Sequence, residues 1–107
     1  MICFGKKAQV LFDRNIANCK IKSSKGIFKE KDYWIAYDNS TFDFWVEEFK
    51  NLGEAICWIE RIFEISQKEK FKIITISNNL FYIEKIGFLE ITIIDNLIQY
   101  RLINHQA

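Results

Sequence analysis

The chain has 107 residues and a formal net charge of +1, and half of its residues are hydrophobic. This length suits a single domain, which we place over residues 1–107, with one core of modest size. No apolar run approaches the roughly 20 residues that cross a bilayer, and the first residues lack the charged and then apolar order of a signal peptide. We therefore expect a cytoplasmic protein without a membrane segment.

The residues that carry most catalytic and metal chemistry are scarce and scattered. Cys3, Cys19 and Cys57 form no closely spaced pair, so they indicate reduced thiols rather than a disulfide framework or a zinc site. The single histidine, His105, lies two residues from the end of the chain, where we do not expect a catalytic base. The four glycines form no phosphate-binding motif. We expect no cofactor, no metal and no enzymatic activity.

The first 22 residues fit two interpretations. Apolar side chains at helical spacing are Ala8, Leu11, Phe12, Ile16 and Cys19. We favour a hairpin of strands at 10–12 and 16–22, because residues 19–22 alternate between apolar and basic side chains. Short strands are then predicted at Gly26–Glu30 and Tyr33–Tyr37.

A strand over residues 42–48 follows a turn at residues 38–41. Along this strand Phe42, Phe44 and Val46 alternate with Asp43, Trp45 and Glu47. The alternation predicts that the three apolar residues face a core and that the other three face outward.

The clearest helix begins after Asn51, which is a good N-cap residue and has Glu54 three residues later. Its predicted core-facing stripe consists of Leu52, Ala55, Ile56, Ile59, Ile62, Phe63 and Ser66. Cys57 falls opposite this stripe, so we expect its thiol to be partly exposed and its pKa to be raised by neighbouring glutamates.

Two hairpins are expected after the helix. The pair Asn78-Asn79 suits a two-residue turn, which would pair Ile76 with Phe81 and Ile74 with Ile83. The pair Asp95-Asn96 similarly joins two strands and pairs Leu89 with Leu102, Ile91 with Tyr100, Ile93 with Ile98, Thr92 with Gln99 and Glu90 with Arg101. Short loops between strands predict an α+β domain, an antiparallel β-sheet meander with one main amphipathic helix packed on it.

Charge is spread unevenly along the chain. Residues 1–37 carry eight basic and three acidic side chains, whereas residues 38–64 carry seven acids against Lys50 and Arg61. Trp45 stands among these acids, which are Asp38, Asp43, Glu47, Glu48, Glu54, Glu60 and Glu64. An exposed tryptophan among carboxylates would anchor a basic partner protein. The pattern equally fits a Trp45 that packs under a second layer of structure.

A second hypothesis concerns the basic strands near the N-terminus. Their lysines are Lys20, Lys22, Lys25, Lys29 and Lys31. Together with Phe28 and Trp34 they would bind RNA or single-stranded DNA by neutralising the backbone and stacking on bases. We favour this less, because lysines alternating with apolar residues also form the solvated face of an ordinary sheet and the chain is nearly neutral. A third possibility is a structural or oligomer-forming module, and the oligomeric state stays open.

The stretch FDFWVEEF and the helix NLGEAICWIERIF give the chain a resemblance to a class of bacterial inhibitors. It resembles the immunity proteins of toxin–immunity systems, especially those of contact-dependent growth inhibition. The resemblance implies a cytoplasmic antitoxin without catalytic activity that binds one cognate toxin domain and covers its active site. It further implies a nuclease toxin, and we expect a ribonuclease whose basic cleft attracts the acidic surface in place of phosphate. The binding residues named above are inferred from this chain and not transferred from that family.

Overall fold

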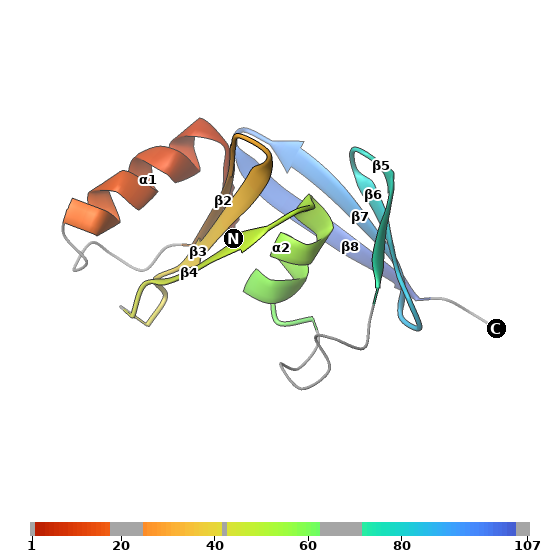
Figure 1. Ribbon diagram of the computed structural model, residues 1–107. Helices are drawn as coiled ribbons and strands as arrows, with labels where there is room; N and C mark the ends of the chain where they lie inside the picture. Colours follow the sequence, from red (N-terminus) through yellow and green to blue (C-terminus); the bar gives the residue numbers. More distant parts are fainter. Residues whose placement is uncertain (1, 18–24, 42, 63–71, 105–107) are drawn as a thin grey trace.

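The computed structural model describes residues 2–17, 25–41, 43–62 and 72–104 (Figure 1). Its elements are β1 (Ile2–Phe4), α1 (Lys6–Ala17), β2 (Lys25–Glu30), β3 (Tyr33–Asp38), β4 (Trp45–Phe49), α2 (Leu52–Ile59), β5 (Ile73–Ser77), β6 (Leu80–Ile83), β7 (Gly87–Ile94) and β8 (Leu97–Asn104). The strands form one curled sheet in the order β4-β3-β2-β1-β8-β7-β6-β5.

The short strand β1 joins the two halves of this sheet. It pairs in parallel with β2 and antiparallel with β8, so that β1, α1 and β2 form a crossover unit. The other neighbouring strands pair antiparallel. The α+β class is confirmed, whereas the simple antiparallel meander with one main helix is not. Three residues are too few to show a strand pattern in the sequence, and β1 exists because both of its edges find partners.

The two helices lie on opposite faces of the sheet. The curl of the sheet surrounds α2, whose Ala55 and Ile56 pack in the main core with Ile27 of β2 and Leu89 of β7 (Figure 1). Helix α1 packs on the other face, where Ala8, Leu11 and Phe12 contact Phe28, Ile35 and Tyr37. Strands β2 and β3 therefore lie between the two helices, which explains why residues 26–28 and 35–39 are buried in unbroken runs.

The predicted N-terminal hairpin is wrong, because residues 6–17 form α1. The helical spacing of apolar residues, rather than the alternation at 19–22, describes this segment, and residues 18–24 lie outside the described part of the chain. Aromatic packing holds the helix in place, since the Phe12 ring lies 5.2 Å from the Phe28 ring and 5.6 Å from the Tyr37 ring. The strands predicted at 26–30 and 33–37 are confirmed, each with one further residue at one end.

The predicted strand over residues 42–48 begins later, at Trp45. Phe44 has a left-handed backbone with φ of 49°, which interrupts the alternation before the strand starts. Val46 is consequently 40% exposed instead of facing the core, while Phe44 packs partly against the Tyr37 cluster. Phe42 lies outside the described residues.

The predicted N-cap of α2 is confirmed. The Asn51 side chain accepts a hydrogen bond of 2.8 Å from the backbone N–H of Glu54. The helix ends at Ile59, earlier than predicted, and residues 63–66 of the expected stripe lie outside the described part. Cys57 is completely buried, which corrects the expectation of partial exposure. The curled sheet covers α2 on several sides, so a residue opposite the predicted stripe still meets protein.

The last hairpin has the predicted register. The structure pairs Leu89 with Leu102, Ile91 with Tyr100, Ile93 with Ile98, Thr92 with Gln99 and Glu90 with Arg101. The last pair forms a 3.1 Å ion pair. Asp95 and Asn96 both have positive φ, at 51° and 62°, as a tight two-residue hairpin turn requires.

The register predicted for the other hairpin is wrong. Ser77 does pair with Leu80 across Asn78-Asn79, but a bulge between Thr75 and Ser77 shifts the pairing by one residue. Ile74 therefore pairs with Tyr82 instead of Ile83, and Ile74 and Ile76 are 51% and 54% exposed. A shift of one residue moves side chains to the other face of a sheet. The bulge thus places Ile73, rather than Ile74, against the core.

Candidate functional site

Strand β4 forms one edge of the sheet. It pairs with β3, and within the described ranges no strand pairs with its other side. Four of its five residues are exposed, and Trp45 is 58% exposed. The sequence left open whether Trp45 packs under another layer, and the structure shows a large aromatic side chain at the surface of an accessible edge strand.

The register divides the side chains of β4 between two faces. Trp45 lies opposite Asp38 and Glu47 lies opposite Ala36, on the face that packs against α2. Val46 lies opposite Tyr37 and Glu48 lies opposite Ile35, on the face that carries α1. Residues two apart on a strand share a face, so Trp45 and Glu47 are neighbours. We call this pair the Trp45 face. Glu48, which the sequence grouped with it, belongs to the other side.

A hydrogen-bonded turn positions the start of β4. Asp38 is only 5% exposed, and its carboxylate accepts hydrogen bonds from the backbone N–H and the hydroxyl of Ser40. The buried Asn39 accepts a 3.0 Å hydrogen bond from the backbone N–H of Phe44. Asp38 thus corrects the expectation of a surface charge, because its carboxylate is used inside the turn. Asp43 is exposed and accepts a 2.9 Å hydrogen bond from the Thr41 hydroxyl.

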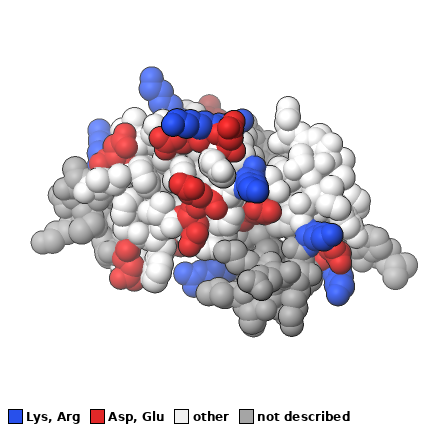
Figure 2. Space-filling model, in the orientation of Figure 1, with Lys and Arg blue, Asp and Glu red and all other residues white. Residues whose placement is uncertain are grey.

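The helix acids occupy different places. Glu54 is half-buried in the first turn of α2, where a carboxylate interacts favourably with the helix dipole. Glu60 accepts a 3.4 Å hydrogen bond from the Tyr100 hydroxyl. The pKa of Tyr100 is raised, mainly by burial and to a smaller extent by the negative charge of Glu60. Glu64 lies outside the described residues. Figure 2 shows acidic side chains near the centre of the face that carries β4, with basic side chains around them. Of the acids predicted for the site, Asp43, Glu47 and Glu48 are exposed.

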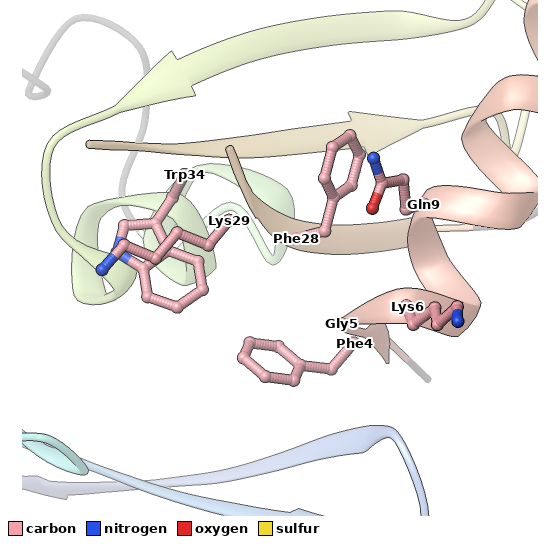
Figure 3. Close-up of a pocket in the computed structure, with 7 residues that line it drawn as sticks. All are labelled: Phe4, Gly5, Lys6, Gln9, Phe28, Lys29 and Trp34. Atoms are coloured by element: carbon pink, nitrogen blue, oxygen red, sulfur yellow. The ribbon is translucent and has the colours of Figure 1, made fainter. Parts of the chain in front are cut away.

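A shallow pocket lies on another part of the surface, where β1 ends and α1 begins (Figure 3). Its volume is about 370 Å³, and its lining residues are Phe4, Gly5, Lys6, Gln9, Phe28, Lys29 and Trp34. The Phe4 and Trp34 rings lie 5.7 Å apart, and the Lys29 ammonium lies 5.7 Å from the centroid of the Trp34 ring. Sequence reasoning found the β2–β3 residues and missed Phe4, Lys6 and Gln9, because it predicted neither β1 nor α1.

The basic residues of the second hypothesis are only partly brought to this pocket. Lys29 lines it, whereas Lys20 and Lys22 lie outside the described residues. Lys25 is the first residue of β2 and Lys31 follows its last residue, and neither lines the pocket. The pocket thus combines two lysines, Lys6 and Lys29, with the neighbouring rings of Phe4 and Trp34.

Cys57 of α2 carries a buried thiol. Burial, and to a smaller extent the Glu54 carboxylate, raises the pKa of Cys57 to about 12. A thiol with a raised pKa is a weak nucleophile at neutral pH. The predicted direction of the pKa shift is confirmed, and burial is its main cause.

This raised pKa predicts a loss of stability in alkali. The folded state holds the thiol proton more tightly than the unfolded chain, so Cys57 adds no pH dependence below about pH 9. Between pH 9 and about 12 its contribution lowers the free energy of unfolding by up to about 1.4 kcal/mol per pH unit. Urea unfolding across this range, compared with the Cys57→Ala variant, measures the effect. Equal slopes for the two proteins would show that Cys57 does not titrate as described.

Among the residues that the structure describes, no three histidine, cysteine, aspartate or glutamate side chains gather as a metal site would require, and no helix there has the length and apolar character needed to cross a membrane. Comparison of the chain with protein-family models, curated proteins and solved structures finds no match.

Proposed function

We propose that this protein is an antitoxin that binds and neutralises a basic toxin domain, in the manner of the immunity proteins that it resembles. The observation that carries the proposal is Trp45, 58% exposed on an edge strand beside Glu47. Exposed tryptophan supplies binding energy when a partner covers it, and nearby carboxylates speed the approach of a basic surface. A nuclease toxin, and in particular a ribonuclease, offers such a surface because its cleft must bind phosphate.

The partner would be anchored on the face of β4 that carries Trp45 and Glu47, and it would be attracted by acidic side chains on both faces of the strand. Trp45 and Glu47 would enter the contact, since they share a face. Asp43 and Glu48 are exposed and close in sequence, so their charges would contribute to long-range attraction. Asp38 would hold the turn and not touch the partner, because it is buried. No catalytic chemistry is required of this chain, since inhibition follows from covering the partner's active site.

The first experiment is a pull-down of the tagged protein after co-expression with the reading frames that neighbour its gene. The expected result is one stoichiometric basic partner that is toxic when expressed alone and harmless together with this protein. Recovery of no partner, or of a partner whose toxicity this protein does not relieve, would contradict the proposal. RNA that is released by salt would instead favour the second hypothesis.

The partner then allows a test of the charges on β4. Replacing Glu47 and Glu48 together by lysine should slow association by about tenfold or more at low salt, because attraction becomes repulsion. Stopped-flow association at several salt concentrations measures this rate. Glu47→Lys alone should also accelerate dissociation, whereas Glu48→Lys, the same charge change on the opposite face, should leave dissociation nearly unchanged. Equal dissociation rates for the two single variants would remove the Trp45 face from the contact.

The pocket beside α1 supports the second candidate function, the binding of single-stranded nucleic acid. The specific observation is the Lys29 ammonium above the Trp34 ring, with Phe4 alongside (Figure 3). A base could stack on Trp34 if Lys29 moved aside to meet a phosphate. Titration of the protein with a labelled oligouridine should then show salt-sensitive binding that Lys29→Ala weakens. Absence of such binding would leave the protein partner as the sole candidate.

A further inference from the structure

Strand β4 is the last strand at one end of the sheet, and its pairing with β3 is regular over all of its residues (Figure 1). The strand at the other end, β5, is interrupted by a bulge between Thr75 and Ser77. Bulges, prolines and lysines are common means by which proteins keep an edge strand from pairing with another chain. Residues 45–49 contain none of these features. Of the two sheet edges in the described part of the chain, β4 is therefore the one suited to accept a further strand.

The hydrogen bonds of the sheet show which groups of β4 point outward. In an antiparallel pair, opposite residues alternately do and do not exchange backbone hydrogen bonds. The carbonyl of Ile27 accepts a 3.0 Å hydrogen bond from the backbone N–H of Gly5, so Ile27 directs its backbone groups toward β1. Ala36 lies opposite Ile27 and therefore directs its own backbone groups toward β4, where it lies opposite Glu47.

Val46 and Glu48 direct their backbone groups away from β3. They flank Glu47, whose groups bond to Ala36, so the N–H and C=O of both residues point to the open edge. Within the described ranges no strand pairs with this side, and the side chains of residues 45–48 are all exposed. Two donors and two acceptors at the spacing of a β-ladder are what an added strand requires.

We propose that the basic toxin domain binds by adding one of its own β-strands to the free edge of β4. This mode of binding rests on the proposed function, because it concerns how that partner is held. Main-chain hydrogen bonds to Val46 and Glu48 supply part of the affinity, and the side chains of Trp45 and Glu47 select the strand. Opposite residues in a sheet share a face, and opposite charges across a pair are favourable. The added strand therefore carries an apolar residue beside Trp45 and a basic residue beside Glu47, two positions apart in its sequence.

A second copy of this chain fits the same edge poorly. Pairing centred on Glu47 or on Glu48 would place that carboxylate opposite its own symmetry mate, and like charges directly opposite are destabilising. Pairing centred on Val46 would place Glu48 opposite Phe44, whose backbone is left-handed with φ of 49° and lies outside the strand. The charges of β4 thus disfavour β4 of another copy and favour a basic strand.

Proline at position 46 tests the main-chain contact. Val46→Pro removes an outward N–H that β3 does not use, and its ring would occupy the space of the added strand. The Kd for the toxin domain recovered by the pull-down should rise by about 100-fold or more. Val46→Ala is the matched control, since it shortens the same side chain but keeps the N–H, and its Kd should stay within about threefold of that of the unchanged protein. Circular dichroism and urea unfolding check that both variants are folded.

Amide hydrogen exchange gives a second readout that needs no substitution. In the free protein the amides of Val46 and Glu48 should exchange rapidly because they face solvent, whereas the Glu47 amide, which bonds to β3, should be protected. Binding of the toxin domain should slow exchange at Val46 and Glu48 by at least about tenfold. NMR of the labelled protein, free and in the complex, resolves the three positions. Should Val46→Pro fail to fold, this measurement decides alone.

The results distinguish the mode of binding from the proposed function. A neutralised toxin domain that binds Val46→Pro as well as Val46→Ala would overturn strand addition and leave the proposed function standing. Rapid exchange at Val46 and Glu48 in the complex would do the same. Slow exchange at both positions in the free protein would show that this edge is already paired, which also overturns strand addition. Recovery of no basic partner would overturn both proposals.

Discussion

Replacing Gly26 by alanine is expected to destabilise the protein by about 3 kcal/mol, the upper part of the usual range for an overfilled core. A Cβ atom at this position would lie 2.4 Å from Cζ and Oη of Tyr37, far inside van der Waals contact. The Tyr37 ring cannot move aside easily. It is fully buried, its hydroxyl donates a 2.9 Å hydrogen bond to the carbonyl of Ala8, and Phe12 and Phe44 pack against it. The clash would therefore loosen α1 from the sheet.

Urea unfolding measures this change, and Gly5→Ala provides a matched control. Gly5 has φ of +71°, but its nearest neighbour to a new Cβ lies at 3.9 Å, so alanine there adds backbone strain of about 1 kcal/mol without a clash. A second check combines Gly26→Ala with Tyr37→Leu, which removes the atoms that clash. The double variant should be less destabilised than the two single effects added together. Simple additivity would show that the approach of Tyr37 is not the reason for glycine at this position.

Replacing Trp45 by alanine is expected to weaken the complex with the proposed toxin partner by about 2–4 kcal/mol, or roughly 30- to 1,000-fold in Kd. The side chain would become buried when the partner binds, and truncation would remove most of that contact. The fold should be unaffected, because Trp45 is 58% exposed in the free protein. Isothermal titration of the two purified proteins measures the Kd.

Val46→Ala is the matched control for this experiment. Val46 is the next residue along β4 and is 40% exposed, but it points to the α1 side of the sheet. Its truncation should change the Kd by no more than about threefold, as expected of a residue outside the contact. An equal loss of affinity from the two truncations would show that the partner contacts both faces of β4. No loss from Trp45→Ala would move the binding site away from β4.

Local sequence patterns predicted the elements in which neighbouring residues decide the outcome. The last hairpin is one case, because Asp95-Asn96 suits the turn and a single register makes both faces of β7 and β8 chemically sensible. The cap of α2 is another, since Asn51 and the Glu54 backbone interact within one helical turn. The strands β2 and β3 were also predictable, although the sequence did not show that helices would cover both of their faces.

Other features depended on contacts between distant segments. Residues 6–17 had two possible periodicities, and packing against Phe28 and Tyr37 selected the helix. The bulge in β5 changed which isoleucines face the core, and no local signal marked it. The candidate site changed for the same reason. Its residues were named from their nearness in sequence, but the sheet separated Glu48 from Trp45 and the turn buried Asp38.

The sequence by itself determined the α+β class, the strands at 26–30 and 33–37, the capped helix after Asn51, the register of the last hairpin and the concentration of acids around Trp45. Each of these follows from turn, cap or periodicity signals within a short stretch. Only the tertiary structure decided that β1 joins the two halves of the sheet, that Cys57 is buried and that Trp45 is exposed. Burial and exposure are set by whatever packs on a residue from elsewhere in the chain, and this information is absent from the residue's own neighbours.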